Sequence, residues 1–353
     1  MAFLGVILAL NSRSKRYRER YAHRRYLTDS NDVWHISDEL FIKHFRLSKQ
    51  SVKSLIQQLQ PHVESRARWA IPFHLQVLAA LNFFGHGCFQ SAVGSSYLNN
   101  MSQSSVSRCI KTVTDLILKH VAPKYISFPM TTMQKMETKK QFYNKYGMSG
   151  IIGCLDCTHI NITVPQKDHP ENPAVLFLNK KGSYSLNVEV ICDADERVIF
   201  ASTTYGGSAS DAAIWQKSPI RALLHKNAED ETYIIGDSSY PSEKYLLTPY
   251  RTPKNPTEEN YNKCLQKTRQ VMDRTLGAIK NRFRCLHPQK ILHYTPDVAG
   301  KIVYAVFTLH NICREHDDPI DCVLEEDDNA DDAFDGVEDV SVRNNYARRY
   351  FQQ

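Results

Sequence analysis

Hydrophobic residues recur with a helical period through the first part of the chain. From residue 36 to about residue 121 they return every three or four positions, as at Val52, Leu55 and Leu59 before Pro61 ends the face. This spacing predicts amphipathic helices. After residue 150 the pattern changes to short apolar runs bounded by Gly, Pro or polar residues, and these predict strands.

The second part of the chain combines strands with helices. Helices are predicted after Ser208, Pro219 and Tyr261 and through residues 302–312. The predicted strands cover residues 151–155, 161–164, 186–192, 198–203 and 233–235. This order is typical of a mixed sheet flanked by helices, so we predict an α/β (α+β) fold preceded by an all-α domain.

A helix-turn-helix is predicted within the all-α part. A short helix over residues 89–98 precedes two turn formers, Asn99 and Asn100, and Ser102 is well placed to cap a second helix. The side chains exposed at the start of this second helix would be Gln103, Ser104, Ser107, Arg108 and Lys111. These types contact DNA grooves, but a plain helical hairpin explains the same spacing equally well.

The stretch IIGCLDCTHI places one carboxylate, Asp156, inside an otherwise apolar run of strand length. An isolated buried carboxylate is costly, so we expect Asp156 to be protonated, paired with a neighbour or next to a cation. Cys154 and Cys157 flank it as a Cys-x-x-Cys pair. Without a second pair at zinc-ribbon spacing, they argue only weakly for a redox or zinc site.

Two further carboxylates lie where a ligand could be held. Asp237 follows the apolar run Tyr-Ile-Ile, at the carboxyl end of a predicted strand, where open sheets hold ligands. Asp273 lies beside the apolar seam of a predicted helix, with Lys280 and Arg284 further along the same stripe. An inward acid with cations beyond it fits a metal site beside a phosphate backbone. An ion pair with Arg269, one turn earlier, or with the neighbouring Arg274 explains Asp273 as well.

Asp211 is a fourth candidate. It lies three residues after Ser208, so the two residues can form a capping box that opens a helix. A further metal-facing acid near the same edge of the sheet is the alternative interpretation.

Charge is unevenly distributed along the chain. The formal net charge is +6, but residues 315–339 contain thirteen Asp and Glu and no Lys or Arg. Without them, 44 Lys and Arg face 25 Asp and Glu, a net charge of +19. This excess suits a polyanionic partner such as DNA. The acidic run itself predicts disorder, and seven Lys and Arg in residues 13–25 predict a nuclear import signal or a nucleic-acid arm.

Cysteines and the first apolar residues bear on the cellular compartment. Nine scattered cysteines indicate reduced thiols inside the cell. The apolar residues 2–10 are too few to span a bilayer and lack the preceding positive charge of a signal peptide. We therefore expect no membrane association.

Several stretches of the chain resemble the PIF/Harbinger superfamily of transposases and the nucleases derived from them. They follow one another in order from about residue 36 to residue 313. The stretches are QVLAALNFFGHGCFQSAVG, MSQSSVSRCIKTV, GCLDCTHI, NKKGSYSLNVEVICD, GGSASDAAIW, YIIGDSSYP, LLTPYR, DRTLGAIKNRFRCL and FTLHNIC. The resemblance implies an RNase H-like catalytic fold with an Asp, Asp, Glu triad.

Matched residue by residue, the two triad Asp positions fall on Asp156 and Asp237. The Glu position falls on Asp273, which departs from the family pattern, and a further acid of the family falls on Asp211. The resemblance implies a metal-dependent DNA endonuclease, in which these acids hold two Mg²⁺ or Mn²⁺ ions that activate a water and stabilise the leaving 3′ oxygen. The same geometry allows strand transfer.

The resemblance also implies partners. Lys280 and Arg284 become candidates for contacts to DNA phosphates, as do Arg108 and Lys111 in the helix-turn-helix. Members of the family commonly work with a separately encoded Myb/SANT-like DNA-binding protein. We expect the nucleus as the location, with the cytoplasm and a homo-oligomer left open.

Asp273 keeps a second hypothesis open, a domesticated DNA-binding or scaffold protein that retains the fold without the chemistry. Under either hypothesis the predicted organisation is the same. It consists of a basic arm (1–35), a helix-turn-helix domain (36–129), an RNase H-like catalytic domain (130–313, its core from about 149) and an acidic, disordered tail (314–353).

Overall fold

A computed structural model describes residues 33–63, 71–96, 98, 101–226, 231–319, 334–336 and 338–352. Nearly all of the predicted basic arm, the predicted turn at Asn99 and Asn100, and much of the acidic run lie outside these residues. The chain divides into two compact units, Met1–Phe83 with Cys88–Val113, and Phe84–Gly87 with Thr114–Gln353. The division falls earlier than the boundary near residue 129 that the sequence suggested.

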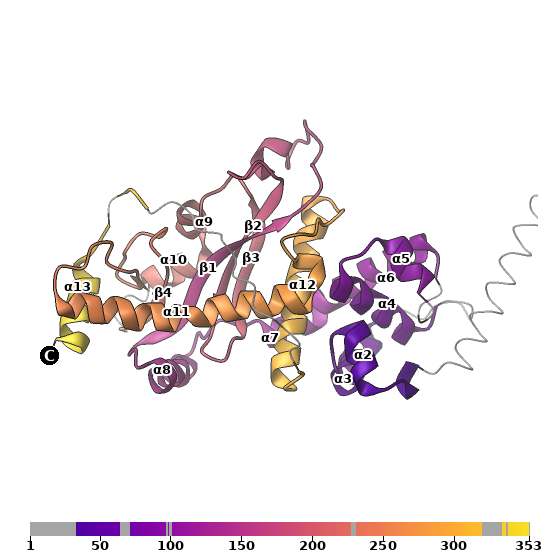
Figure 1. Ribbon diagram of the computed structural model, residues 1–353, viewed down its shortest axis with the longest axis horizontal. Helices are drawn as coiled ribbons and strands as arrows, with labels where there is room; N and C mark the ends of the chain where they lie inside the picture. The colour runs from indigo at the N-terminus through magenta and orange to yellow at the C-terminus, as the bar shows by residue number, and fades with distance from the viewer. Residues whose placement is uncertain are drawn as a thin grey trace, which may run out of the picture. The chain divides into compact units, whose positions relative to one another are not determined.

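The described residues begin with helices alone (Figure 1). Ser37 and Ser48 cap the first two α-helices by accepting backbone N–H groups, and Phe41, Phe45 and Leu55 are buried beneath them. The elements are η1 (Val33–His35), α2 (Asp38–Phe45), α3 (Lys49–Leu59), η2 (Gln60–His62), α4 (Phe73–His86), α5 (Gln90–Ser95) and α6 (Gln103–Leu116).

Helices α5 and α6 form the helical pair that the sequence predicted. The Ser102 hydroxyl accepts a hydrogen bond from the Ser105 backbone N–H at 3.3 Å, so Ser102 caps α6. Val106, Ile110 and Val113 are buried, as their spacing predicted. Beyond Leu116 the helical path continues through the π-helical turn η3 (Ile117–Val121) into α7 (Ala122–Tyr125).

The second unit is built around a mixed sheet, which has five strands in the described residues and the order β3-β2-β1-β4-β5. Strand β1 pairs antiparallel with β2, which pairs antiparallel with β3, whereas β4 and β5 continue the sheet in parallel. The strands are β1 (Ile151–Asn161), β2 (Ser185–Cys192), β3 (Val198–Gly206), β4 (Tyr233–Ile235) and β5 (Leu246–Leu247). This arrangement confirms the predicted RNase H-like α+β fold.

Strand β1 is longer than predicted. It runs unbroken to Asn161 because its backbone pairs with β2 as far as Asn161↔Ser185. A separate strand at residues 161–164 was therefore a wrong prediction, since beyond Asn161 only Ile162 makes an isolated bridge, with Leu292. The two residues of β5 are too few to show a period, and the sequence did not reveal them.

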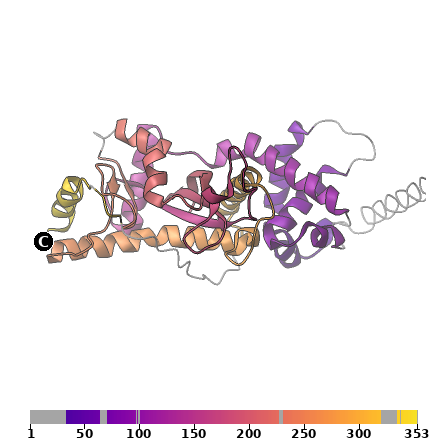
Figure 2. The ribbon, with the colours of Figure 1, turned by 90° about the horizontal axis from the view of Figure 1, so that it is seen from above.

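Helices pack on both faces of the sheet. Figure 1 shows α11 crossing the strands, and Figure 2, turned by 90°, shows it along one face with α10 on the other. Helix α12 packs along β3, where Gly300 lies so close that an added Cβ would be 2.9 Å from the Thr203 carbonyl oxygen. The remaining elements are α8 (Thr132–Tyr146), η4 (Ala174–Phe177), α9 (Asp211–Lys217), α10 (Pro219–Lys226), α11 (Pro256–Arg282), η5 (Arg284–Leu286) and α12 (Pro296–Glu315). None of the described helices is long and apolar enough to cross a bilayer.

The end of the chain corrects a prediction. Helix α13 (Ser341–Phe351) packs against α11, so the predicted disorder of residues 314–353 is wrong for this part. The Tyr346 hydroxyl donates to the Ser149 carbonyl oxygen at 2.7 Å, and its ring lies edge-on to Tyr233 and Tyr261. This helix contains few apolar residues and directly follows the acidic run, so its sequence shows no clear helical pattern.

Candidate active site

Asp156 lies in β1 on the face that α11 covers. The Cys157 backbone N–H donates to its Oδ1 at 2.8 Å, and the Arg269 guanidinium of α11 donates to its Oδ2 at 3.1 Å. The Asp156 side chain is only 18% exposed. Burial raises the pKa of Asp156 to about 7, against the lowering effect of Arg269 and with a further raising effect of Asp237. Of the alternatives that the sequence left open for Asp156, the structure shows the carboxylate paired with a neighbour.

Asp237 follows β4 in a tight turn. The Ser239 backbone N–H and hydroxyl both donate to its Oδ1, at 3.0 and 2.5 Å. Strands β1 and β4 are parallel neighbours with Cys154 opposite Ile235. Continuing that register by two residues brings Asp237 level with Asp156. Asp156 in β1 and Asp237, just beyond the end of the adjacent strand β4, therefore lie at the same level of the sheet.

Asp273 lies on the exposed side of α11, one turn after Arg269. Burial alone would lower the pKa of Arg269, but the charges of Asp156, Asp237 and Asp273 together raise it above its usual value. The guanidinium thus pairs with Asp156 in β1, and the charges of Asp237, after β4, and of Asp273, on the same helix, also act on it. The sequence had suggested Arg269 as a partner of Asp273, and its ion pair at 3.1 Å is with Asp156.

Asp211 belongs to a different environment. Its Oδ1 accepts from Asn187 Nδ2 at 2.8 Å, and Asn187 pairs with His159 of β1. Because side chains alternate along a strand, His159 points to the face opposite Asp156. Asp211 is buried against that opposite face, at 7% exposure. The four candidate acids therefore divide into a group of three and Asp211 alone.

The predicted capping box at the start of α9 is wrong. The hydroxyl that accepts a backbone N–H, that of Ala213 at 3.4 Å, belongs to Ser210 and not to Ser208. The Ser208 hydroxyl instead donates to the Leu176 carbonyl oxygen at 2.7 Å. Asp211 is the first residue of the helix.

The group of three acids fits a divalent cation in its chemistry. Carboxylate oxygens are the ligands that Mg²⁺ and Mn²⁺ prefer, and the guanidinium of Arg269 shows that this position favours positive charge. Among the described residues, no three Asp, Glu, His or Cys side chains stand close enough together to hold an ion as they lie. Binding would therefore require side chains of the group to turn.

The basic candidates differ in exposure. Lys280, on α11, is only 5% exposed, whereas Arg284 is exposed in η5, beyond the end of the helix. Lys280 and Arg284 therefore do not form the continuous stripe that the sequence predicted. Of the two, Arg284 has the side chain that solvent, and hence a phosphate, can reach.

The candidate residues of the helical pair are accessible. Gln103, Ser104, Arg108 and Lys111 are exposed on α6, and Ser107 is half-buried. The Gln103 side-chain amide donates to the side-chain Oε1 of Gln90, in α5, at 2.7 Å. A polar, basic surface at the start of α6 is thus present, as expected for either a DNA-reading helix or a plain hairpin.

Glu189, in β2, was missed by the sequence reasoning. It is fully buried, and neither of its carboxylate oxygens has a hydrogen-bond partner among the described residues. Burial raises the pKa of Glu189 to about 7, and the nearby Ser218 side chain lowers it without making a full hydrogen bond. The signal that revealed Asp156, a charge inside an apolar strand, was present here too, in LNVEVIC.

The Cys-x-x-Cys pair forms no site of its own. Cys154 shares the Asp156 face and donates to the Thr268 carbonyl oxygen at 3.7 Å, whereas Cys157 points to the opposite face. Burial raises the pKa of the Cys157 thiol well above its usual value. All eight cysteines of the described residues are free thiols.

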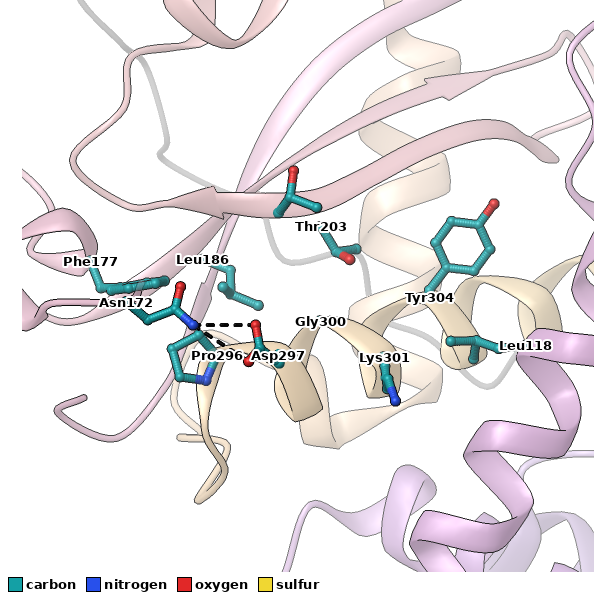
Figure 3. Close-up of a pocket in the computed structure, with 11 residues that line it drawn as sticks. Leu118, Asn172, Phe177, Leu186, Thr203, Pro296, Asp297, Gly300, Lys301 and Tyr304 are labelled. Carbon is teal, nitrogen blue, oxygen red and sulfur yellow. Dashed lines mark hydrogen bonds between the residues drawn. The ribbon is translucent and has the colours of Figure 1, made fainter. Parts of the chain in front are cut away.

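A separate cavity of about 270 Å³ lies beside α12 (Figure 3). Asn172 donates to both carboxylate oxygens of Asp297 at its rim, at 3.3 and 3.4 Å, and Lys301 and Tyr304 line it further along the helix. Its described lining includes none of the four candidate acids. We assign no chemistry to it.

Comparison with known proteins identifies the family of the chain. Residues 155–311, which include all four candidate acids, match the family described as DDE superfamily endonuclease. The chain is 33% identical to the rat (Rattus norvegicus) protein named Putative nuclease HARBI1, over 80% of this chain and 79% of that protein. It is 32% identical to the human protein of that name, with the same coverage. An Arabidopsis thaliana protein named ALP1-like is 25% identical over 69% of this chain and 61% of its own length. No solved structure matches the chain.

Proposed function

The chain belongs to the DDE superfamily, among the nucleases derived from Harbinger transposases, and on this premise we propose that it is a metal-dependent DNA endonuclease. The proposed active site consists of Asp156, Asp237 and Asp273. The observation that carries the proposal is the placement of the acids. Asp156 lies in β1, Asp237 follows the adjacent strand β4, and α11, which carries Asp273, reaches Asp156 through Arg269 at 3.1 Å. Carboxylates gathered in this way form a local excess of negative charge, which a divalent ion can neutralise.

The three carboxylates would be held with different rigidity. Asp156 is held by a backbone N–H within the central strand, and Asp237 by two donors of Ser239. Asp273 stands on an exposed helical surface, with a side chain one methylene shorter than Glu. When bound, a pair of Mg²⁺ or Mn²⁺ ions would polarise the phosphate and activate a water. The two strand acids are the fixed part of such a site and Asp273 the adjustable part.

DNA is the substrate that the basic character of the chain supports. The exposed side chains at the start of α6 are suited to phosphates and base edges, and Arg284 is suited to phosphates. Asp211 lies at the other face of the sheet, where it accepts a hydrogen bond from Asn187, and is not one of the proposed ligands. We further propose a nuclear location and a Myb/SANT-like DNA-binding partner, both on the strength of the family.

A second function is binding without cleavage. It is favoured by one observation, the Asp at position 273, whose carboxylate reaches less far than the Glu of the family. A protein of this kind would bind DNA with the same surfaces and leave the phosphodiester bond intact. Strand transfer, in place of hydrolysis, would use the same acids.

Nicking of supercoiled DNA tests the proposal. With Mg²⁺ or Mn²⁺ the wild-type protein should nick the plasmid, and Asp156→Ala and Asp237→Ala should each lower the rate by at least 100-fold, on the order of what the loss of a metal ligand costs. Asp297→Ala, an exposed acid beside the separate cavity, is the matched control and should retain the wild-type rate. Equal residual nicking by all four proteins would refute the enzyme and leave the binding function.

A further inference from the structure

Arg269 lies at the centre of the proposed active site. Its guanidinium donates one hydrogen bond, to Asp156 Oδ2 at 3.1 Å, and its Nε has no hydrogen-bond partner among the described residues. Arginine and carboxylate groups frequently pair through two parallel hydrogen bonds. Here the contact is made through a single N–H. Such an attachment is weaker than a bidentate pair and easier to exchange.

The oxygen that Arg269 occupies is the one that a cation would need. Asp156 Oδ1 is already bound to the Cys157 backbone N–H, so Oδ2 is the oxygen directed toward α11. The Arg269 charge also interacts with Asp237 and Asp273, the other two proposed ligands. A divalent ion among these acids would therefore approach a fixed positive charge, which repels it.

From this geometry we infer that Arg269 is an internal counter-ion, which holds the place of the divalent cation and must leave Asp156 before the cation can bind. The inference rests on the proposed function, because it assumes that the three acids take up an ion. It assigns Arg269 a positioning role. Without metal, the guanidinium neutralises the buried carboxylate and keeps the three acids together, and on metal binding it turns toward solvent.

Two consequences distinguish this role from a merely structural one. A structural ion pair, once removed, lowers the stability of the protein whether or not metal is present. A counter-ion that competes with the metal, once removed, lowers stability in the absence of metal and strengthens metal binding. The second consequence is the informative one, because loss of a structural contact does not improve a binding site.

Binding of Mn²⁺ to the full chain, measured by electron paramagnetic resonance without DNA, tests the inference. Arg269→Gln should bind Mn²⁺ about tenfold more tightly than wild type, the order of the effect of a neighbouring Arg on a carboxylate. Arg269→Lys, which keeps the charge, should lie between the two. Arg274→Gln is the matched control, because Arg274 lies on the same helix but pairs with Glu196 and Tyr146, and its Mn²⁺ affinity should equal that of wild type.

Thermal melts of the same proteins provide the second readout. Arg269→Gln should melt at a lower temperature than wild type without Mn²⁺, and saturating Mn²⁺ should raise its melting temperature by more than that of wild type. Equal Mn²⁺ affinity of wild type, Arg269→Gln and Arg269→Lys would overturn the inference and leave the proposed function standing, provided that Asp156→Asn abolishes binding. Absence of Mn²⁺ binding in every protein would overturn both. An equal gain in Mn²⁺ affinity for Arg274→Gln would mean that loss of any positive charge on this helix has the same effect. That result would also overturn the inference.

Discussion

The carboxyl group of Glu189, in β2, is fully buried, and neither of its oxygens accepts a hydrogen bond among the described residues. Its pKa is raised to about 7 in the folded protein, above the usual value of 4.5. The folded protein therefore binds this proton more tightly than the unfolded chain does. The stabilisation is complete below pH 4.5 and is lost as the pH rises through 7.

Replacing this carboxyl group should remove part of that pH dependence. Glu189→Gln should raise the free energy of unfolding at pH 8 by about 3 kcal/mol, the equivalent of the pKa shift, and change it little at pH 4. Urea unfolding of the metal-free protein at the two pH values measures the difference. Glu259→Gln, at an exposed position of α11, is the control and should change neither value. A Glu189→Gln protein whose stability falls with pH as steeply as wild type would contradict this account.

The length of the side chain at position 273 sets how far the third acid reaches. A Glu there extends about 1.5 Å further than Asp, a distance that matters when Mg²⁺ contacts are about 2.1 Å long. Asp273→Glu should therefore raise the rate of Mg²⁺-dependent nicking several-fold. The same lengthening at Asp237, which Ser239 holds in place, should lower it. A reduced rate in Asp273→Glu would show that the site is built for Asp.

A buried tyrosine is one of the residues that attach α13 to the rest of its unit. Tyr346 is 3% exposed, and its hydroxyl satisfies the Ser149 carbonyl oxygen just before β1. Tyr346→Phe keeps the ring contacts and removes the donor, so it should lower the free energy of unfolding by about 1 kcal/mol. Tyr350→Phe is the control, because Tyr350 is 41% exposed, and its stability should match that of wild type. Equal stability of both variants would mean that the hydrogen bond of Tyr346 adds nothing to stability.

Helix α6 presents an exposed arginine that can distinguish a DNA-reading helix from a plain hairpin. If α6 contacts phosphates, Arg108→Ala should weaken DNA binding and reduce the slope of log K against log salt by about 1. Lys43→Ala, at an exposed position of α2, is the charge-matched control and should leave the slope unchanged. Fluorescence anisotropy with labelled duplex DNA over a salt series measures both. Identical slopes for Arg108→Ala and wild type would assign the α5–α6 pair to structure.

Across the chain, the sequence pattern correctly predicted those elements that depend on residues close together in the sequence. The apolar period of α11 and the apolar runs of β2, β3 and β4 were correctly predicted, because each element buries one stripe or face. The position of Asp237 followed from the short run before it. The length of β1 and the presence of β5 did not follow, since strand pairing decided both.

Contacts between distant parts of the chain lay beyond such patterns. Arg269 and Asp156 are 113 residues apart in the sequence, and their pairing depends on how α11 crosses the sheet. The face on which Asp211 lies depends on the register of β1 and β2, in which a shift of one residue reverses every side chain. Tyr346 depends on a partner 197 residues away. The sequence therefore suggested the acids as candidates, whereas the structure showed that Arg269 pairs with Asp156.

Direct contact between the acids and a metal ion is the central claim, and metal rescue of a cysteine variant tests it. Asp237→Cys should lose Mg²⁺-dependent nicking by at least 100-fold, because a thiolate is a poor ligand for Mg²⁺, and should regain it when Mn²⁺, which accepts sulfur more readily, replaces Mg²⁺. Asp297→Cys should nick at the wild-type rate with either ion. Rescue by Mn²⁺ at position 237 would place this carboxylate on the metal. An Asp237→Cys protein that nicks DNA with Mg²⁺ as fast as wild type would contradict the account.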